Sequence, residues 1–306
     1  MTGGSGVLGT ALKVLATSIK DREFIFFTSE ECDLTNFQNT VNFVKLVSPD
    51  AILHLAALSG GVELSTNFPA TLLRDNILMT FNILEAARLT NCAKTLLTLS
   101  SGMYPPEAPL PINERTIHSG PPHFSNYSYS HAKRIMEPAI RAYRTEYEMN
   151  VIGLVPNGIF GEGDDFRHQS STMLPALIRR FFENKNSAEF ISVWGDGTPL
   201  REYTYSIDMA QCFLWCLDNY HESSILNVGT NEEHTIKEIS FMIADFLNID
   251  RSRILFDPTK PRGVYQKSMD NSTFCELSNF QYSSLSEGLQ HTIDWFQDNY
   301  PNNVRL

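Results

Sequence analysis

The chain has 306 residues, of which 42% are hydrophobic and 19% charged, a composition typical of a globular protein with one or two domains. Its net charge of −11 argues against broad contact with nucleic acid or an acidic membrane, and no apolar run reaches membrane-spanning length. The five cysteines are odd in number and scattered, which excludes a disulfide framework, so we expect reduced thiols and a cytoplasmic location.

Short apolar segments alternate with helical segments through the first half of the chain. Strands are predicted at 23–29, 51–57, 95–101 and 150–156, and helices at 8–20, 36–47, 68–90 and 129–147. This alternation is typical of right-handed βαβ crossovers. It predicts an α/β fold with a doubly wound parallel Rossmann sheet.

The pattern changes after Pro156 and predicts a smaller, mixed α/β lobe. The expected elements there are a helix at 173–185, a strand at 190–195 and helices at 206–220 and 235–249. We therefore expect a dinucleotide-binding domain over 1–155, joined again by about 201–220, and a substrate lobe over 156–306.

The first residues, MTGGSGVLGTALKVL, place glycines at 3, 6 and 9. In a Rossmann unit such glycines allow a tight turn, close approach of the backbone to a pyrophosphate, and close helix packing. The wide G-x-x-G-x-x-G spacing is weak evidence alone, but the amphipathic segment after it strengthens the prediction of a dinucleotide site. A buried strand normally precedes this loop. We expect either that native residues precede Met1 or that another segment fills the gap.

A candidate proton-transfer pair lies in NYSYSHAKR, where Tyr129 and Lys133 are four residues apart on one predicted helix face. An unperturbed tyrosine has a pKa of about 10, and a lysine one turn away can lower it. Ser100 or Ser101, at the end of the predicted strand 95–101, offers a hydroxyl to complete the site. Y-x-x-x-K is common on exposed helices, but its combination with the serines and the glycine loop is far more specific.

The residues after the second predicted strand bear on the choice of cofactor. An acidic group there favours a free ribose 2′-hydroxyl, and a basic group favours a 2′-phosphate. Thr28 and Ser29 suit either form, while Glu30 and Glu31 count mildly against the phosphate. NADP is the preferred prediction, with NAD left open.

Several longer stretches carry a family resemblance, among them AILHLAALSGG, GPPHFSNYSYSHAKR, GIFGEGDDF and VWGDGTPLREY. On these motifs the chain resembles the extended short-chain dehydrogenase/reductase family of epimerases and dehydratases, and within it the GDP-L-fucose synthase branch. The resemblance implies an NADP-dependent oxidoreductase, with no metal, that reduces a nucleotide-linked 4-keto-6-deoxy sugar. It also implies a homodimer, for which the helices at 68–90 and 129–147 are candidate contacts.

The resemblance also implies roles for individual residues. Ser100 and Tyr129 would polarise and protonate the C4 oxygen, and Lys133 would hold the cofactor ribose. Further cofactor contacts are implied for Gly3, Gly4, Ser5, Gly6, Val7, Leu8, Gly9, Ser29, Asp33, Leu34, Leu55, Ala56, Ala57, Asn76, Leu99, Ser101, Pro156, Asn157, Gly158 and Ile159. Contacts to the nucleotide sugar are implied for Leu177, Arg180, Val193, Trp194, Arg201 and Lys267.

The chemistry of the last group agrees with this role, since a guanidinium binds phosphate oxygens in pairs and an indole stacks on a base or sugar. Other roles remain open: Trp194 as a core residue, and Arg201 as the partner of Glu202 or Asp208. Arg179 and Arg180 point about 100° apart on a helix, so we expect only one to reach the site. The guanosine assignment rests on family likeness alone.

Two positions depart from the family pattern. Members of the branch epimerise C3 and C5 with a cysteine and a histidine, where this chain has Gly102 and Thr172. Neither residue can exchange a proton near neutral pH, and His168 is a possible replacement for the acid alone. A third departure is Gly158, expected to remove a side chain that faces cofactor or substrate.

The sequence therefore predicts a C4-ketoreductase without the epimerase step. The alternatives are a bifunctional synthase that epimerises with other groups, and a non-catalytic dinucleotide-binding protein.

Overall fold

The computed structural model describes residues 1–168, 170–260 and 264–306. Its larger part contains a four-stranded parallel sheet with the order β1-β2-β3-β7. The strands are β1 (Ala51–His54), β2 (Lys94–Thr98), β3 (Val151–Pro156) and β7 (Leu226–Val228). Every residue of β3 is buried, as expected for a parallel strand covered by helices on both faces.

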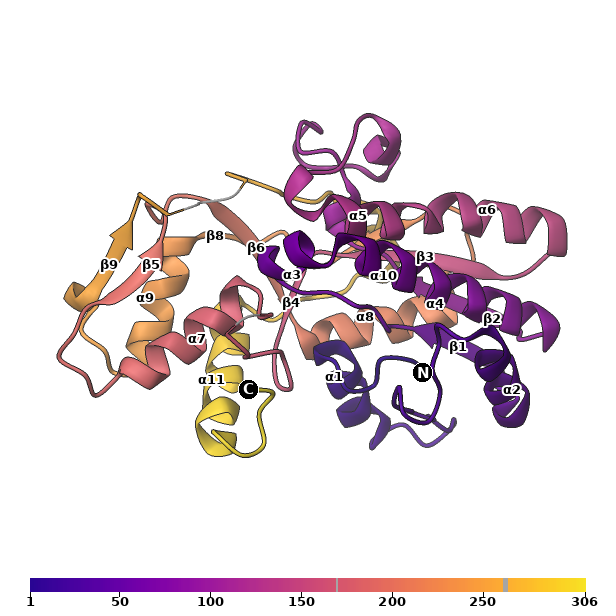
Figure 1. The fold of residues 1–306 in the computed structure, drawn as a ribbon, viewed down its shortest axis with the longest axis horizontal. Helices are drawn as coiled ribbons and strands as arrows, with labels where there is room; N and C mark the ends of the chain where they lie inside the picture. Colours follow the sequence, from indigo (N-terminus) through magenta and orange to yellow (C-terminus); the bar gives the residue numbers. More distant parts are fainter. Residues whose placement is uncertain (169, 261–263) are drawn as a thin grey trace.

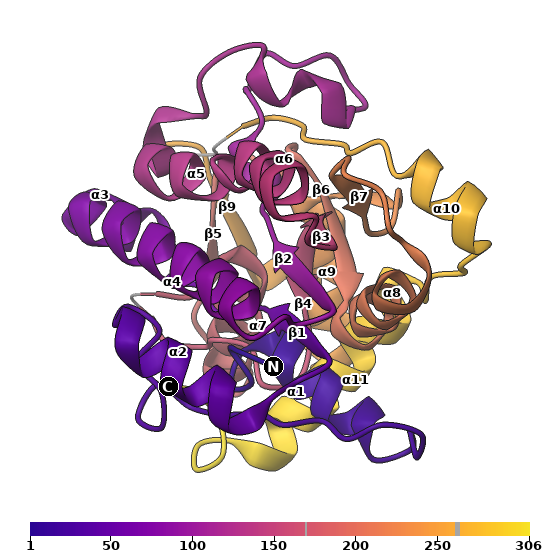
Figure 2. The same cartoon turned by 90° about the vertical axis from the view of Figure 1, so that its right-hand side faces the viewer.

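Helices cover both faces of this sheet (Figures 1 and 2). On one face α1 (Val7–Ala16) and α8 (Ser206–Asn219) pack on the sheet in one cluster, which includes Leu96. On the other face α4 (Pro69–Leu89) and α6 (Met136–Tyr147) pack in a second cluster, which includes Leu97. Neighbouring residues of β2 thus face opposite clusters. The predicted doubly wound α/β fold is confirmed.

The predicted strand at 23–29 does not form: residues 23–28 have no regular secondary structure, and a turn begins at residue 29. Its neighbour consists of two residues: the Met1 ammonium donates to Ile25 O (2.6 Å), and Thr2 makes a single parallel bridge with His54. So short a partner cannot support a ladder of hydrogen bonds. The apolar side chains of this segment still pack on the domain, and the Phe27 ring lies 4.4 Å from that of Phe43 on α2 (Phe37–Val47).

Two other differences concern short elements. The predicted helix 129–147 is divided at Ile135 into α5 (Tyr127–Arg134) and α6. Strand β7 was not predicted because its three residues are too few to show a period.

The second lobe is built on two small sheets and three helices. Its strands are β4 (Gly158–Phe160), β5 (Ile191–Trp194), β6 (Leu200–Tyr205), β8 (Glu233–Thr235) and β9 (Ile254–Asp257). Its helices are α7 (Met173–Asn184), α9 (Ile236–Phe246) and α11 (Leu285–Asn299). Helices α9 and α11 each begin with a capping box, Thr235 with Glu238 and Ser284 with Glu287. The domain boundary at residue 155 stays a prediction.

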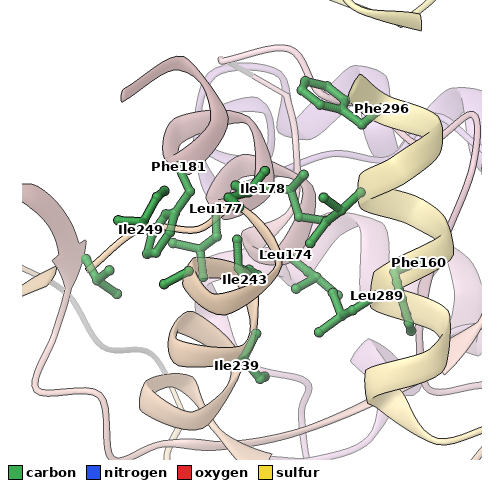
Figure 3. Close-up of a cluster of buried hydrophobic side chains, with 14 of the residues drawn as sticks. Phe160, Leu174, Leu177, Ile178, Phe181, Ile239, Ile243, Ile249, Leu289 and Phe296 are labelled. Carbon is green, nitrogen blue, oxygen red and sulfur yellow. The ribbon is translucent and has the colours of Figure 1, made fainter. Parts of the chain in front are cut away.

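The three helices enclose one apolar cluster that contains Phe160, Leu174, Ile243 and Phe296 (Figure 3). The remaining elements are α3 (Val62–Asn67), α10 (Ser272–Ser278) and 3-10 turns at Ser101–Met103, Glu114–His118, Phe124–Asn126 and Arg251–Arg253. Among the described helices, none combines the length and the hydropathy needed to cross a membrane. Within the same part of the chain, no three His, Cys, Asp or Glu side chains are grouped as metal ligands would be.

Candidate active site

The glycine loop leads directly into α1 and packs against Leu55 and Ala56, the two residues that follow β1. Gly3 has a φ of 68°, and a Cβ at this residue would lie 2.7 Å from Ala56 N. A Cβ on Gly9 would lie 2.6 Å from Gly4 Cα, so both positions require glycine. A Cβ on Gly6 would meet only Gly3 O, at 3.5 Å, and Gly6 precedes α1 without a side-chain cap. The N-terminus of α1 is therefore left open to a phosphate group.

Thr2 holds the segment that follows β1. Its Oγ1 accepts hydrogen bonds from Leu55 N (3.0 Å) and Ala56 N (2.9 Å) and lies 3.0 Å from His54 Nδ1. Because both lone pairs of this hydroxyl are used, its own proton goes to His54 Nδ1. Burial lowers the pKa of His54 to about 3, so the imidazole is neutral. This arrangement presents residues 55–57 beside the glycine loop, where cofactor contacts are predicted.

The side chains of Asn76 and Asp33 make hydrogen bonds to residues close by in the same domain. Asn76 Oδ1 accepts from Leu58 N (3.0 Å), and its Nδ2 donates to Leu58 O (2.9 Å). Asp33 Oδ1 accepts from Thr35 N (2.9 Å) and Thr35 Oγ1 (2.7 Å), while Ser29 is exposed. Asn76 would therefore affect cofactor binding indirectly, by holding the backbone of Leu58 in place.

Ser100, Tyr129 and Lys133 come together near the C-terminal end of β2. Tyr129 and Lys133 lie on α5, with the Lys133 ammonium 5.9 Å from the centre of the Tyr129 ring. Lys133 Nζ donates to Thr98 O (2.8 Å), at the end of β2. The Ser100 hydroxyl accepts from Gly102 N (3.2 Å) and interacts with the Tyr129 side chain in the direction that lowers the pKa of Tyr129. The predicted proton-transfer residues therefore form one cluster.

Burial controls the protonation of this cluster. It raises the pKa of Tyr129 to about 12, and the hydrogen bond from Ser100 offsets this only in part. It lowers the pKa of Lys133 to about 7. The expectation that Lys133 lowers the pKa of Tyr129 is not met, because burial dominates. A tyrosine with so high a pKa remains protonated near neutral pH and can deliver its proton to a strongly basic alkoxide.

The segment 156–159 is turned partly into the protein. Asn157 Oδ1 accepts from Thr204 Oγ1 (2.7 Å), and its Nδ2 donates to Thr230 O (2.9 Å). A Cβ on Gly158 would lie 2.7 Å from Glu202 O. The prediction that Gly158 removes a side chain facing cofactor or substrate is wrong, because β6 occupies that space.

The family's base and acid positions are occupied here by Gly102 and Thr172. Gly102 follows Ser100 in a 3-10 turn and has no side chain. Thr172 is exposed and makes no side-chain cap at the start of α7. The His168 imidazole is 68% exposed and lies 3.7 Å from the carboxylate of Glu183, on α7.

Three cationic side chains of the second lobe are predicted substrate contacts: Arg180, Arg201 and Lys267. Burial lowers the pKa of both guanidinium groups. Burial, followed by the charge of Arg201, lowers the pKa of Lys267 to about 8. Among the described residues, none of the three takes part in an ion pair. Partly buried cations without counter-charges favour binding of an anion.

The two carboxylates considered as partners of Arg201 are used elsewhere. Glu202 accepts from Met269 N (3.1 Å), and Asp208 accepts from Ser283 N (2.7 Å). Arg201 instead donates to Leu200 O (2.6 Å). Its remaining donors can therefore serve a ligand.

The adjacent arginines of α7 diverge as predicted. Arg179 is paired with Glu183 (2.7 Å), whereas Arg180 Nη1 donates to Ser192 O on β5 (2.8 Å). Only Arg180 is therefore turned toward the strand that carries Trp194.

The remaining predicted substrate residues differ in exposure. Trp194 is 55% exposed, so the core role left open for it is excluded, whereas Val193 is 1% exposed. Successive residues of a strand point to opposite faces, and Val193 faces the core. Leu177 is also part of that core (Figure 3). The structure thus does not support substrate contacts by the side chains of Val193 and Leu177.

Comparison with known proteins bears on this site directly. Residues 1–229 match the NAD dependent epimerase/dehydratase family. The chain belongs to this family. The match covers the glycine loop and the cluster of Ser100, Tyr129 and Lys133, so the chain is an enzyme of the family that the sequence motifs predicted.

Individual relatives match over almost the whole chain. A GDP-L-fucose synthase of Dictyostelium discoideum is 31% identical, over 98% of this chain and 95% of its own. A GDP-L-colitose synthase of Yersinia pseudotuberculosis is 30% identical, over 97% of this chain and 96% of its own. The structure of a GDP-L-fucose synthetase from Naegleria fowleri bound to NADP has a TM-score of 0.93 and 30% identity, and covers 100% of this chain and 95% of that chain. The expected Rossmann fold is confirmed.

Some residues of the site were not identified from the sequence. Thr98 holds Lys133 through a backbone carbonyl, for which a sequence carries no signal. Asn126 and Ser130 lie close to Gly102. They are four residues apart around Tyr129, a helical spacing that could have indicated them.

Substitution of two glycines can distinguish a glycine needed for packing, Gly9, from one needed for cofactor binding, Gly6. Gly9→Ala is expected to lower the free energy of unfolding by about 1–3 kcal/mol, because its methyl group would overlap the backbone of Gly3 and Gly4. Gly6→Ala is expected to leave stability nearly unchanged and to weaken NADPH binding, because its methyl group would lie where a phosphate approaches α1. Urea unfolding and NADPH fluorescence titration measure the two effects. Equal losses of stability in both variants would contradict this assignment.

Proposed function

We propose that this protein is an NADPH-dependent reductase of the C4 ketone of a GDP-linked 4-keto-6-deoxy sugar, and that it lacks the 3,5-epimerase step. The observation that carries the proposal is an assembled cluster of Ser100, Tyr129 and Lys133 beside a glycine in the place of the family's cysteine. Tyr129 can supply a proton to an alkoxide, whereas Gly102 has no side chain that could act as a base toward C3 or C5.

The residues of the first domain fit a dinucleotide. The uncapped start of α1 suits the pyrophosphate, and the open side of Gly6 lets it approach. The chemistry that bound NADPH supplies is hydride donation to C4. Lys133, held by Thr98 O, would bind the ribose hydroxyls.

Tyr129 and Ser100 perform the proton chemistry. Both hydroxyls would donate hydrogen bonds to the C4 oxygen, which orients the ketone and stabilises the negative charge that develops on it. Tyr129 then transfers its proton to this oxygen, and the alcohol is formed. A tyrosine pKa of about 12 suits this direction, because the group is protonated before each turnover.

The second lobe supports a nucleoside diphosphate as the bound part of the substrate. Arg180, Arg201 and Lys267 supply positive charge without ion-pair partners among the described residues. Trp194, exposed on β5, offers a surface for stacking of a base or sugar. The names of the relatives, which are synthases of GDP-L-fucose and GDP-L-colitose, favour guanosine over other bases.

Proton exchange in deuterated water tests the proposal. The protein is incubated with GDP-4-keto-6-deoxy-mannose, and the C3 and C5 protons are followed by NMR before NADPH is added. We expect no exchange, followed by reduction to a product that retains the configuration at C3 and C5. Exchange at either carbon would indicate a bifunctional synthase. Failure to bind NADPH in a fluorescence titration would contradict both enzymatic alternatives.

A further inference from the structure

Arg134 is a nearly buried arginine on α5 that contacts the turn carrying Ser100. Its Nε donates a hydrogen bond to Met103 O (3.0 Å), and its Nη2 donates to the same oxygen. Its Nη1 donates to Gly120 O (2.7 Å). Three hydrogen bonds from one planar guanidinium fix the direction of both carbonyl groups, a geometry that the single nitrogen of a lysine does not reproduce.

The two carbonyl groups mark the ends of one long loop. The chain leaves the 3-10 turn after Met103, passes through residues 104–119 and returns at Gly120, before α5 begins (Figure 1). The ends of the loop lie close together, since a Cβ on Gly120 would be 3.4 Å from the Cβ of Pro105. Arg134 therefore joins both ends of the loop to α5.

Hydrogen bonds within the turn connect this contact to Ser100. Met103 N donates to Ser100 O (3.0 Å), and Gly102 N donates to Ser100 Oγ (3.2 Å). Because the turn is closed by its own hydrogen bonds, a shift at Met103 would also displace Ser100. Tyr129 lies on the same helix as Arg134, so the contacts of the guanidinium bear on the placement of Ser100 relative to Tyr129.

The charge of Arg134 is not compensated by an ion pair. The residue is 8% exposed, and its guanidinium pairs with no carboxylate in the part of the chain that the structure describes. Burial of a cation without a counter-charge is unfavourable, and it lowers the pKa of this group. Features that are unfavourable for folding are concentrated at functional sites, which favours a role for Arg134 beyond stability.

We propose that Arg134 is a positioning residue for the reduction, which holds the turn 100–103 so that the hydroxyl groups of Ser100 and Tyr129 can both reach the C4 oxygen. This inference rests on the proposed function, because Arg134 acts through the contact of Ser100 with the ketone. Its own donors bind backbone carbonyls, so its effect is on the chemical step and not on binding of the nucleotide.

A double-mutant cycle tests the inference, with GDP-4-keto-6-deoxy-mannose and NADPH as substrates. Arg134→Lys keeps the charge but not the planar set of donors, and it is expected to lower kcat by about ten- to hundredfold, because a misplaced Ser100 loses its contact with the reacting oxygen. In the Ser100→Ala background the same substitution is expected to lower kcat by less than about threefold, since the hydroxyl to be positioned is absent. An arginine that served only the fold would give the same factor in both backgrounds.

Arg144→Lys is the matched control. The guanidinium of Arg144, on α6, also donates to two backbone carbonyls, Val151 O (3.0 Å) and His221 O (2.7 Å), but both lie outside the turn and the loop. Its kcat is expected to stay within about twofold of wild type. NADPH fluorescence titration confirms folding in every variant. Arg134→Gln, which removes the buried charge and keeps an N–H donor, takes the place of Arg134→Lys in the cycle if the lysine variant does not fold.

Equal factors in the two backgrounds, or a kcat within about twofold of wild type for the Arg134 variant, would overturn the inference. Failure of both Arg134 variants to fold would overturn it too, since the residue would then serve the structure as a whole. Absence of reduction by wild-type protein that binds NADPH would instead contradict the proposed function, and the inference with it.

Discussion

Replacing Tyr129 by phenylalanine is expected to lower kcat by about 10²–10⁴-fold, the usual contribution of a positioned general acid. The phenyl ring fills the same volume and keeps its place beside Lys133, whose ammonium lies 5.9 Å from the ring centre. The substitution removes the proton, the hydrogen bond proposed for the C4 oxygen and the interaction of the Tyr129 hydroxyl with Ser100. KM for the sugar is expected to change much less than kcat, because the residues proposed to bind the nucleotide lie in the other lobe.

The matched control is Tyr127→Phe, on the same helix. Tyr127 is 50% exposed and packs against the ring of His131, so its hydroxyl is not part of the cluster. Its kcat is expected to stay within about twofold of wild type, as for a surface substitution. NADPH oxidation and NADPH fluorescence follow turnover and cofactor binding. A Tyr129→Phe variant with nearly full kcat would show that another group delivers the proton.

Much of the fold could be predicted because helices and buried strands leave local patterns. The apolar runs at 51–57 and 150–156 correspond to β1 and β3, whose residues pack between two layers of helices. The run at 23–29 is also apolar but forms no strand, since its pairing with Met1 and Thr2 is a single hydrogen bond, from the Met1 ammonium to Ile25 O. Strand formation depends on a partner, which a local pattern cannot reveal.

In the candidate site, as in the fold, features with a local sequence pattern could be predicted and features that depend on distant residues could not. Tyr129 and Lys133 could be found from their helical spacing, and Ser100 from its place at the end of a strand. The surroundings of Gly158 were misjudged because they come from β6, far along the chain. The effect of burial on the pKa of Tyr129 depends likewise on everything packed around it, not on the one lysine visible in the motif.

Replacing Lys133 by methionine is expected to raise stability at low pH while reducing activity. Burial lowers the pKa of Lys133 from its ordinary 10.5 to about 7, so between these values the unfolded chain binds a proton that the folded protein does not. The contribution of Lys133 to the free energy of unfolding therefore rises as the pH increases through this window. Below about pH 7 its charge must be buried, at a cost on the order of 5 kcal/mol.

Methionine has a similar length and no charge, but it leaves Thr98 O without its donor, a loss of about 1–3 kcal/mol. We therefore expect Lys133→Met to be stabilised by about 2–4 kcal/mol near pH 6, with the difference shrinking as the pH approaches 9. Urea unfolding of both proteins across this range measures it. Burial also raises the pKa of Glu202 to about 8 and of Asp164 to about 7, which weakens folding as pH rises. Both groups are present in each protein, so their effects cancel in the difference.

The same variant is expected to bind NADPH less tightly and to reduce the sugar more slowly, because Lys133 is the residue proposed to bind the cofactor ribose. A lysine that served only the fold would behave in the opposite way: its removal would destabilise the protein at every pH and leave cofactor binding intact. Stabilisation at low pH together with weaker NADPH binding would mean that the fold tolerates an unfavourable buried charge at a residue that cofactor binding uses.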